Sequence, residues 1–299
     1  MKTHPNFAPL VVGTTAIFLA QLSGVFYPSQ TYALKGLGNS GVLASTLGNL
    51  PANAESNDPN IALGNKEFLL SQATSSPIRF VPPADKSTRR SQGSGSRGCE
   101  QSLPGDLVTL LIPSKDYIAQ TTSSHPTFFW HLSQNVSVPL KFTLVERGVA
   151  EPLFIKQINS PEAGMLKLEL PKDKPGLASG RIYSWSVTLE CNARRPSANP
   201  YFYSWIERVP TTPALEQKLA AVSSRSKSFE QTPASESASR ELASIYAEAG
   251  LWYDTLTSLS TARTENPSDR LVQEDFLALL KQVGLVEVAK QEQQSLAQR

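Results

Sequence analysis

The sequence predicts an α+β chain in which an antiparallel β-sandwich comes first and a short region of helical hairpins follows. Two observations predict it. Between Asp106 and Val209, apolar and polar residues alternate with the period of strands. After Pro213, small and apolar residues recur instead at the three- and four-residue spacing of amphipathic helices. The expected order is therefore strands and then helices, in two successive regions.

The N-terminal 33 residues are predicted to be a secretory signal peptide. Lys2 precedes a largely apolar run from Phe7 to Tyr27, and the short residues Thr31 and Ala33 fit the small-x-small cleavage rule. We expect cleavage after Ala33 and export to the periplasm, the envelope or the extracellular space. The alternative is an uncleaved anchor helix, because the apolar run approaches the length of a bilayer span. Membrane contact is expected only through this segment, and only if it is retained.

Residues 34–98 are predicted to form a disordered linker. The stretch is rich in Ser, Asn, Gly and Pro and shows no sustained period of either kind. Its last part carries Lys86, Arg89, Arg90 and Arg97 without an acidic residue among them. Such a run is typical of a solvated linker, and the alternative is contact with an anionic surface.

The chain contains two cysteines, Cys99 and Cys191. In an exported chain such a pair is most simply a disulfide. A loop of this length would contribute about 4 to 5 kcal/mol in the chain-entropy account. Two thiols lack the companions of a tetrahedral zinc site, and no CxxC spacing indicates redox chemistry. We therefore predict a disulfide-closed domain over residues 99–209 and no metal site.

Short alternating runs separated by turn residues define the strands of the sandwich. The predicted strands are 107–112, 128–132, 140–144, 153–158, 166–170, 183–191 and 201–209. The order of Pro126 to Trp130, a loop, and then Tyr183-Ser-Trp185 resembles fibronectin type III and related immunoglobulin-like modules. That resemblance implies that Trp130 and Trp185 pack in the core and that Tyr183 ties a corner; ligand contact is the alternative for these rings. His131, opposite Trp130 on its strand, is expected to be half-exposed.

Residues 210–299 are predicted to form helical hairpins. A bridging helix is predicted from Pro213 to Val222, and Gly250 is predicted to end the next helix with a left-handed cap. Gly284 lies 34 positions after Gly250, and the surrounding apolar residues repeat weakly at that shift. The residues that resemble the tetratricopeptide repeat pattern are Ala243, Tyr246, Gly250, Trp252, Ala262 and Pro267.

Trp252, Tyr253 and Asp254 open the second helix of the first hairpin and are candidate partner-binding residues. For the two aromatic side chains we weigh two interpretations, core packing between hairpins and an exposed anchor for a partner. Asp254 and the dispersed Glu207 are also candidates if the protein were an enzyme with paired carboxylates. Two hairpins are fewer than a free-standing array needs, so the helices are expected to lean on the sandwich or on a partner.

Catalytic and cofactor motifs do not stand out in the sequence. His125 and His131 are the only histidines of the expected mature chain, and no GxSxG sequence surrounds a serine. We find no phosphate-binding glycine loop, HExxH or dinucleotide fingerprint. The formal net charge of +2 and the predicted export argue against a nucleic-acid partner. No catalytic residue, cofactor or metal is therefore predicted.

Several motifs together resemble a cyanobacterial family described as domain of unknown function 928. They are the Arg/Gly segment before Cys99, the PTFFW strand at 126–130, the YSWSVTLEC strand at 183–191, the WIERV strand end at 205–209 and YAEAGLWYDTL at 246–256. The resemblance covers about residues 97 to 289. It implies a cyanobacterial envelope or secreted protein and supplies no activity, cofactor or catalytic residue.

The sequence therefore favours a non-enzymatic envelope or secreted protein that acts by binding another envelope protein of unknown identity. The helical hairpins would face the partner, and the disulfide-closed sandwich would be the scaffold. Inference of this kind from fold alone is analogy. The alternative is an enzyme or binding module that acts on cell-envelope polysaccharide or peptidoglycan.

Overall fold

The computed structural model describes residues 77–93, 99, 103–228 and 234–297. The chain divides into a unit of residues 1–69 and a unit of residues 70–299, and every described residue belongs to the second. The predicted signal peptide, its cleavage after Ala33 and most of the predicted linker lie outside the described residues. Within them, no helix is both long and apolar enough to cross a membrane.

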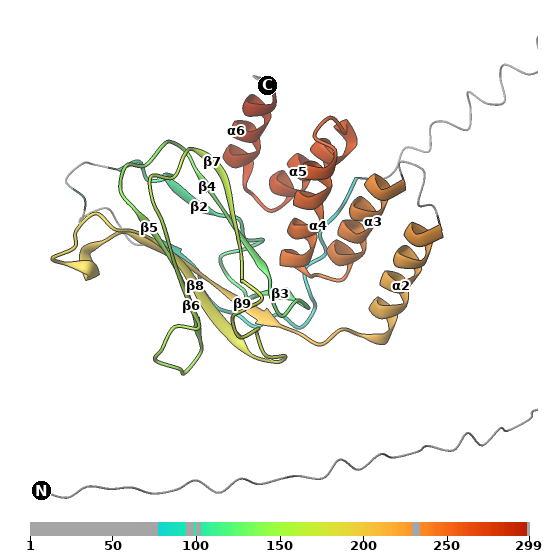
Figure 1. Ribbon diagram of the computed structural model, residues 1–299, viewed down its shortest axis with the longest axis horizontal. Helices are drawn as coiled ribbons and strands as arrows, with labels where there is room; N and C mark the ends of the chain where they lie inside the picture. Colours follow the sequence, from blue (N-terminus) through green and yellow to red (C-terminus); the bar gives the residue numbers. More distant parts are fainter. Residues whose placement is uncertain (1–76, 94–98, 100–102, 229–233, 298–299) are drawn as a thin grey trace, which may run out of the picture. The chain divides into compact units, whose positions relative to one another are not determined.

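The second unit begins with strands and ends with helices, which confirms the predicted α+β order (Figure 1). The strands are β1 (Gln92–Gly93), β2 (Val108–Leu110), β3 (Ala119–Thr121), β4 (Thr127–Leu132), β5 (Leu140–Glu146), β6 (Phe154–Ile158), β7 (Gly164–Glu169), β8 (Ile182–Leu189) and β9 (Tyr201–Arg208). Every predicted strand is present. The alternating pattern missed β1 and β3, because strands of two or three residues are too short to show a period.

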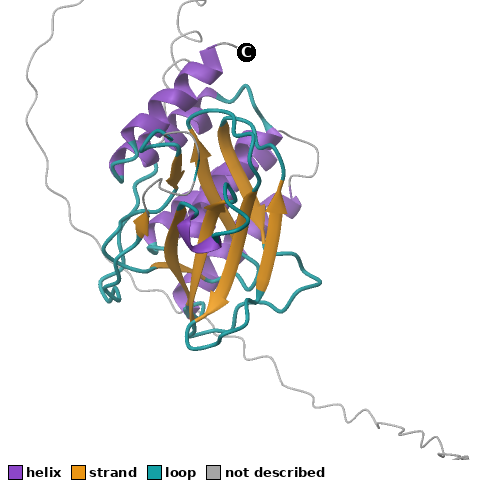
Figure 2. Cartoon of the chain, turned by 90° about the vertical axis from the view of Figure 1, so that its left-hand side faces the viewer, coloured by secondary structure: helices purple, strands orange, loops and turns teal. Residues whose placement is uncertain are grey.

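The strands form two sheets. One has the order β1-β9-β8-β5-β6, with the short β3 pairing in parallel to β9, and the other has the order β2-β4-β7. All other pairings are antiparallel. Figure 2 looks onto the strands with helices behind them. Positive φ angles at Gly148, Gly164 and Gly180 fall between strands or at a strand end, where residues with a side chain would be strained.

A cluster of aromatic side chains fills the space between the two sheets. Phe128 of β4 lies with its ring centroid 5.0 Å from that of Phe142 in β5 and 5.2 Å from that of Trp185 in β8. Trp130 and Trp185 are both fully buried, as the core interpretation predicted. Tyr183 is also buried, and its hydroxyl accepts a hydrogen bond from the Ala178 amide at 2.9 Å. This hydrogen bond links Tyr183 to the loop that precedes β8.

Among the described residues, five helices follow the strands. They are α2 (Pro213–Ser228), α3 (Ala234–Glu248), α4 (Trp252–Glu265), α5 (Arg270–Gln282) and α6 (Val286–Ala297). Gly250 joins α3 to α4 and has the positive φ that the left-handed cap predicted there requires. Gly284 joins α5 to α6 and also has a positive φ. Asp269 caps α5 by accepting hydrogen bonds from the amides of Leu271 and Val272. Two consecutive helical hairpins are thus present.

Helix α4 packs on β4 of the three-stranded sheet, and α6 packs on β7. As a result, all six residues of β4 are buried, on both faces of the strand. His131 was expected to be half-exposed, and this expectation is wrong: it lies beneath the helices with only 4% of its surface exposed. Burial lowers the pKa of His131, and the nearby carboxylates of Glu292 and Asp106 oppose that shift.

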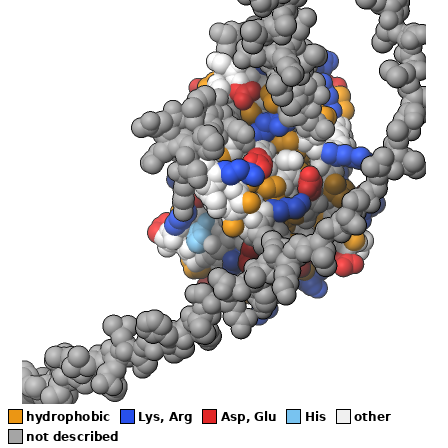
Figure 3. All heavy atoms as spheres, turned by 90° about the vertical axis from the view of Figure 1, so that its right-hand side faces the viewer, with side chains coloured by type: hydrophobic (Ala, Val, Ile, Leu, Met, Phe, Trp, Pro, Cys, Tyr) orange, Lys and Arg blue, Asp and Glu red, His pale blue; other side chains and the backbone are white. Residues whose placement is uncertain are grey.

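Helix α2 packs along α3 at the outer end of the helical layer. The pair is bridged by Lys218 with Glu248 at 3.1 Å and by Arg225 with Glu241. Figure 3 views the right-hand side of Figure 1, where α2 lies, and shows basic and acidic side chains next to one another. Exposed pairs of this kind contribute little to stability.

The part of the predicted linker that the structure describes is ordered. Residues 77–93 include two side chains buried in the core, Ile78 and Phe80, and strand β1. Thr88 forms a bridge with Tyr117, and Ser91 shares a hydrogen bond with Ser204 of β9 at 2.8 Å. The boundary at residue 98 is therefore wrong for this stretch, because a few apolar residues hold an otherwise polar segment in place.

Candidate functional site

Residues Pro77–Pro83 cross the helical layer in an extended conformation. Their exposure alternates as in a strand: Ile78 and Phe80 are buried, whereas Arg79 and Val81 are exposed. The Phe80 ring meets the Trp252 ring edge-on, with centroids 5.1 Å apart and planes at 81°. We call residues 77–83 the extended segment.

Helical residues hold the extended segment mainly through its backbone. The Phe80 amide donates to Gln282 Oε1 at 3.0 Å, and Gln282 Nε2 donates back to the Phe80 carbonyl at 2.8 Å. The Val81 amide donates to the Ala247 carbonyl at the end of α3, at 3.0 Å. The Ile78 amide donates to Asp275 Oδ1 at 3.2 Å. These hydrogen bonds are made to backbone atoms, so they do not depend on the side chains of the segment. Only the two buried positions, Ile78 and Phe80, restrict which side chains fit.

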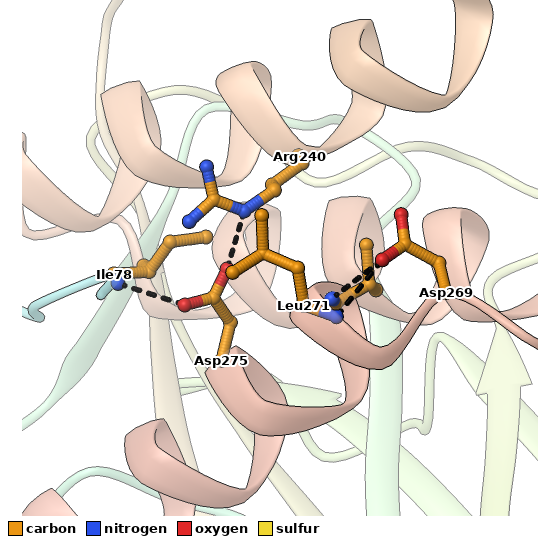
Figure 4. A network of polar contacts seen from close by, with 6 residues as sticks. Ile78, Arg240, Asp269, Leu271 and Asp275 are labelled. Atoms are coloured by element: carbon orange, nitrogen blue, oxygen red, sulfur yellow. Dashed lines mark hydrogen bonds and ion pairs between the residues drawn. The ribbon is translucent and has the colours of Figure 1, made fainter. Parts of the chain in front are cut away.

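Asp275 of α5 lies at the centre of this network, which Figure 4 shows from close by. Its side chain is 2% exposed, and its second oxygen, Oδ2, accepts a hydrogen bond from Arg240 Nε of α3 at 2.5 Å. One buried carboxylate therefore joins α3, α5 and the extended segment. The arginine compensates the charge, which a buried carboxylate requires.

Gly250 allows the extended segment to approach the turn between α3 and α4. A Cβ atom at this position would lie 3.0 Å from the Pro83 ring and 3.0 Å from the Val81 carbonyl oxygen. The glycine thus serves two purposes, since its positive φ also closes the first hairpin. We call the residues that receive the segment the segment-binding surface, defined by Ala247, Gly250, Trp252, Asp275 and Gln282.

Trp252 and Tyr253 are buried, at 0% and 1% exposure. Trp252 Nε1 donates a hydrogen bond to the Leu111 carbonyl at 2.8 Å, which attaches α4 to the sandwich. Their burial agrees with the core interpretation. The alternative of an exposed partner anchor is wrong for these two side chains, because the sandwich and the extended segment already cover them.

Asp254 lies in a polar pocket of about 320 Å³ at the junction of α4 with the sandwich. Its two oxygens accept hydrogen bonds from the Thr122 amide and the Thr122 hydroxyl, both at 3.1 Å. Burial raises the pKa of Asp254, and its hydrogen bonds with Thr121 and Thr122 partly offset the shift. The pocket is lined by Thr121, Thr122, Ser123, His125, Pro126, Thr127, Tyr246, Tyr253, Asp254, Thr257 and Ser258.

His125 of this pocket already has hydrogen-bond partners on both ring nitrogens. His125 Nδ1 and the Ser124 hydroxyl share a hydrogen bond at 3.0 Å, and His125 Nε2 contacts the Lys174 carbonyl at 3.1 Å. Tyr246 is half-buried, and burial followed by the charge of Asp254 raises its pKa. Asp254 is the one acidic residue in the lining, so this pocket does not supply the carboxylate pair that a glycosidase uses.

Glu207, the other carboxylate considered from sequence, lies on β9 outside that pocket and accepts a hydrogen bond from Gln120 Nε2 at 3.2 Å. The buried Glu292 of α6 pairs with Arg263 at 3.0 Å. Across the described residues, no group of three or more His, Cys, Asp and Glu side chains is arranged to hold a metal ion.

Cys99 and Cys191 form the predicted disulfide, with Cα atoms 4.9 Å apart. The bond ties the residues that follow β8 to the chain between β1 and β2. This pairing was predictable because the sequence offers a single combination.

The extended segment was missed from sequence. The sequence pattern places it within the predicted linker, because it lies among polar and proline residues. The signal that was available is the alternation of Ile78 and Phe80 with Arg79, ahead of Pro82 and Pro83. An alternation of three residues does not by itself distinguish an ordered extended segment from a linker; the helical residues that contact it make that distinction.

The comparisons with known proteins add a family but no activity. The family model described as "Domain of Unknown Function (DUF928)" matches residues 92–293. No curated protein matches the chain in sequence. Among solved structures, a multi-domain immunophilin from Arabidopsis thaliana aligns at 10% identity with a TM-score of 0.21, covering 64% of this chain and 96% of the other. That likeness is too low to carry an argument. The family match spans more than half of the chain, which therefore belongs to the family of the domain of unknown function 928.

Proposed function

We propose that this chain is a non-enzymatic protein that binds another envelope protein through its helical layer. The observation that carries the proposal is the extended segment, which the helices hold by backbone hydrogen bonds and two buried apolar side chains. Main-chain hydrogen bonds with pockets for alternate side chains are a general mode of peptide recognition. A surface of this kind can bind any segment with the same backbone and the same apolar positions.

The proposed location is the periplasm, the envelope or the extracellular space of a cyanobacterium. The disulfide between Cys99 and Cys191 fits an oxidising compartment. The apolar N-terminal stretch and the small residues at Thr31 and Ala33 fit an export signal. N-terminal sequencing of the mature protein tests this directly, and a chain that still begins at Met1 would contradict cleavage after Ala33.

The proposal of a non-enzymatic role rests on what the buried acids do. Asp254 attaches α4 to Thr122, Asp275 pairs with Arg240, and Glu292 pairs with Arg263. Each of these carboxylates has a structural partner from another element. Catalytic acids and bases instead need access to a substrate.

A capture experiment tests the proposed function. The Val81→Pro chain, whose own segment has lost the amide that donates to Ala247, is compared with the same chain carrying Gln282→Ala, which removes the two hydrogen bonds that a bound segment would make with this glutamine. The same chain carrying Gln294→Ala, an exposed glutamine on α6, serves as a matched control. Each is expressed in the native cells, crosslinked briefly and isolated under denaturing conditions. We expect one identified envelope protein to be recovered with Val81→Pro alone and with added Gln294→Ala, and to be reduced at least fivefold with added Gln282→Ala. Equal recovery with all three chains, or recovery of no protein, would contradict the proposal.

The outer face of the larger sheet favours a second candidate function, binding of envelope polysaccharide. Tyr201, Tyr203 and Trp205 alternate along β9 on that face, with neighbouring ring centroids 5.7 and 6.3 Å apart. The register places Thr188, Ser186 and Ser184 of β8 directly opposite them. Aromatic rings beside hydroxyl groups offer both apolar contact and hydrogen bonds to a neutral sugar chain.

Co-sedimentation with purified peptidoglycan or cell-wall polysaccharide tests this second candidate. Tyr201→Ala and Tyr203→Ala should each reduce the bound fraction several-fold. Val286→Ala, an exposed apolar residue on α6 rather than on this sheet, is the control and should leave binding unchanged. A bound fraction that all three variants leave unchanged would exclude this face as the glycan site.

A further inference from the structure

We propose that the segment-binding surface is a docking site for an extended segment of a partner polypeptide with an aliphatic residue and, two positions later, an aromatic residue. The chain's own residues 77–83 are then its intramolecular competitor. This inference rests on the proposed function and names the chemistry of the partner.

The side chains of the extended segment show which apolar residues the segment-binding surface prefers. Ile78 and Phe80 are the buried positions, and Phe80 makes edge-on contact with Trp252. Arg79 between them is exposed, so the middle residue of a partner's segment is unrestricted. The spacing of two follows from the extended backbone, on which alternate side chains face the same way.

The hydrogen bonds define what the surface requires of the backbone of a partner's segment. Three amides of the segment donate to the helices, those of Ile78, Phe80 and Val81, and one carbonyl accepts, that of Phe80. A partner's segment must therefore have an N–H group at these three positions. Proline, which lacks that group, is excluded there and is tolerated after them, as Pro82 and Pro83 show.

The region matched by the family model includes the segment-binding surface but not the extended segment. All five residues that define the segment-binding surface lie within residues 92–293, whereas residues 77–83 lie before the matched region. The surface thus belongs to the family domain, and the segment that fills it here lies outside that domain. This arrangement is expected if the surface can receive segments from more than one source.

Tethering gives the chain's own segment an advantage over a free partner. A segment joined by a short linker acts at an effective concentration of roughly millimolar. A partner's apparent affinity falls in proportion to the fraction of molecules whose surface is vacant. Loosening the extended segment should therefore strengthen binding of a segment supplied in trans.

Two variants of the full chain loosen the segment in different ways. Val81→Pro removes the amide that donates to Ala247 without trimming a buried side chain. The double variant Ile78→Ala with Phe80→Ala removes both apolar contacts. Circular dichroism and thermal unfolding establish that each variant is folded, and Val81→Pro keeps the test valid if the double variant is not.

The probe is a fluorescent peptide with the sequence of residues 76–84, titrated by fluorescence anisotropy. We expect it to bind Val81→Pro at least tenfold more tightly than the wild-type chain, and the double variant more tightly still. A control peptide with alanine in place of Phe80 should bind at least tenfold more weakly. Adding Gln282→Ala to the Val81→Pro chain should weaken binding several-fold, because both hydrogen bonds to Phe80 are then missing.

Failure of this inference can be distinguished from failure of the proposed function. No binding to folded Val81→Pro, equal binding to the wild type and both variants, or binding that ignores Gln282→Ala would each overturn the inference. If the capture experiment still recovered a Gln282-dependent protein, the proposed function would stand with a partner of different chemistry. If the peptide bound as expected and no such protein were captured, the proposed function would fail instead.

Discussion

The indole Nε1 of Trp185 donates a hydrogen bond to the hydroxyl of Tyr253 at 2.8 Å, and both side chains are buried. The contact joins β8 of the larger sheet to α4. The Tyr253 hydroxyl in turn donates to the Trp205 carbonyl of β9 at 3.3 Å. Burial raises the pKa of Tyr253, so the hydroxyl keeps its proton, and both contacts persist, at neutral pH.

Tyr253→Phe should destabilise the protein by about 1 to 3 kcal/mol, because the buried indole N–H and the Trp205 carbonyl both lose this partner. The measurement is urea unfolding of the wild type and the variant. Tyr201→Phe is the control, since Tyr201 is 42% exposed and should change the unfolding free energy by no more than about 0.5 kcal/mol. Equal effects of the two changes would contradict a structural role for the Tyr253 hydroxyl.

Trp252→Ala should lower the unfolding free energy by about 3 to 5 kcal/mol, because it removes a fully buried ring that contacts Phe80 and Leu111. Denaturant unfolding followed by circular dichroism measures the change. Val286→Ala, at an exposed position on α6, should have little effect. A stable Trp252→Ala protein that merely lost a partner would instead restore the interpretation of this residue as a surface anchor.

Asp254 should make the protein less stable as the pH rises through the raised pKa of its folded state. Burial raises the pKa of Asp254 in the folded state above its ordinary value, so the folded state holds this proton more tightly than the unfolded state does. The stabilising contribution is therefore fully present at pH values below the unfolded pKa, and it is lost as the pH rises through the folded pKa. Because other carboxylates titrate in the same range, the measured quantity is the difference in unfolding free energy between wild type and Asp254→Asn. A difference that does not decline with rising pH would refute this account.

Reduction of the Cys99–Cys191 bond should lower the unfolding free energy by about 4 to 5 kcal/mol in the chain-entropy account, because the two residues are 92 positions apart. Thermal unfolding with and without a reductant measures the loss. The double variant Cys99→Ser with Cys191→Ser should start from the lower stability and show no response to the reductant. An equal response of both proteins would mean that the reductant acts elsewhere.

Gln282→Ala should increase the rate of trypsin cleavage after Arg79 about tenfold. The change removes two hydrogen bonds to Phe80, each contributing about 0.5 to 1.5 kcal/mol, and a tenfold population shift corresponds to about 1.4 kcal/mol. Limited proteolysis with mass spectrometry follows this cut. Cleavage after the exposed Arg194 is the internal reference. Unchanged cleavage after Arg79 would show that these two hydrogen bonds do not hold the extended segment.

Local pattern was enough for most of the fold. The alternation of Leu140, Phe142 and Leu144 placed β5, and Gly250 and Gly284 placed the two hairpin turns, because strand period and left-handed caps are properties of neighbouring residues. The disulfide was equally predictable from the sequence, since two cysteines allow a single pairing within the chain. The exposure of His131 was wrong because a strand's second face can be covered by helices that come much later in the chain.

The sequence by itself determined the order of strands and helices, the cysteine pair and the apolar character of Trp130, Trp185 and Trp252. The tertiary structure decided which faces are covered and which helical residues contact the extended segment. Asp275 and Gln282 are unremarkable on their own helix, and they meet the extended segment from 197 and 202 positions away. Contacts over such separations depend on how whole elements pack, so no local pattern encodes them.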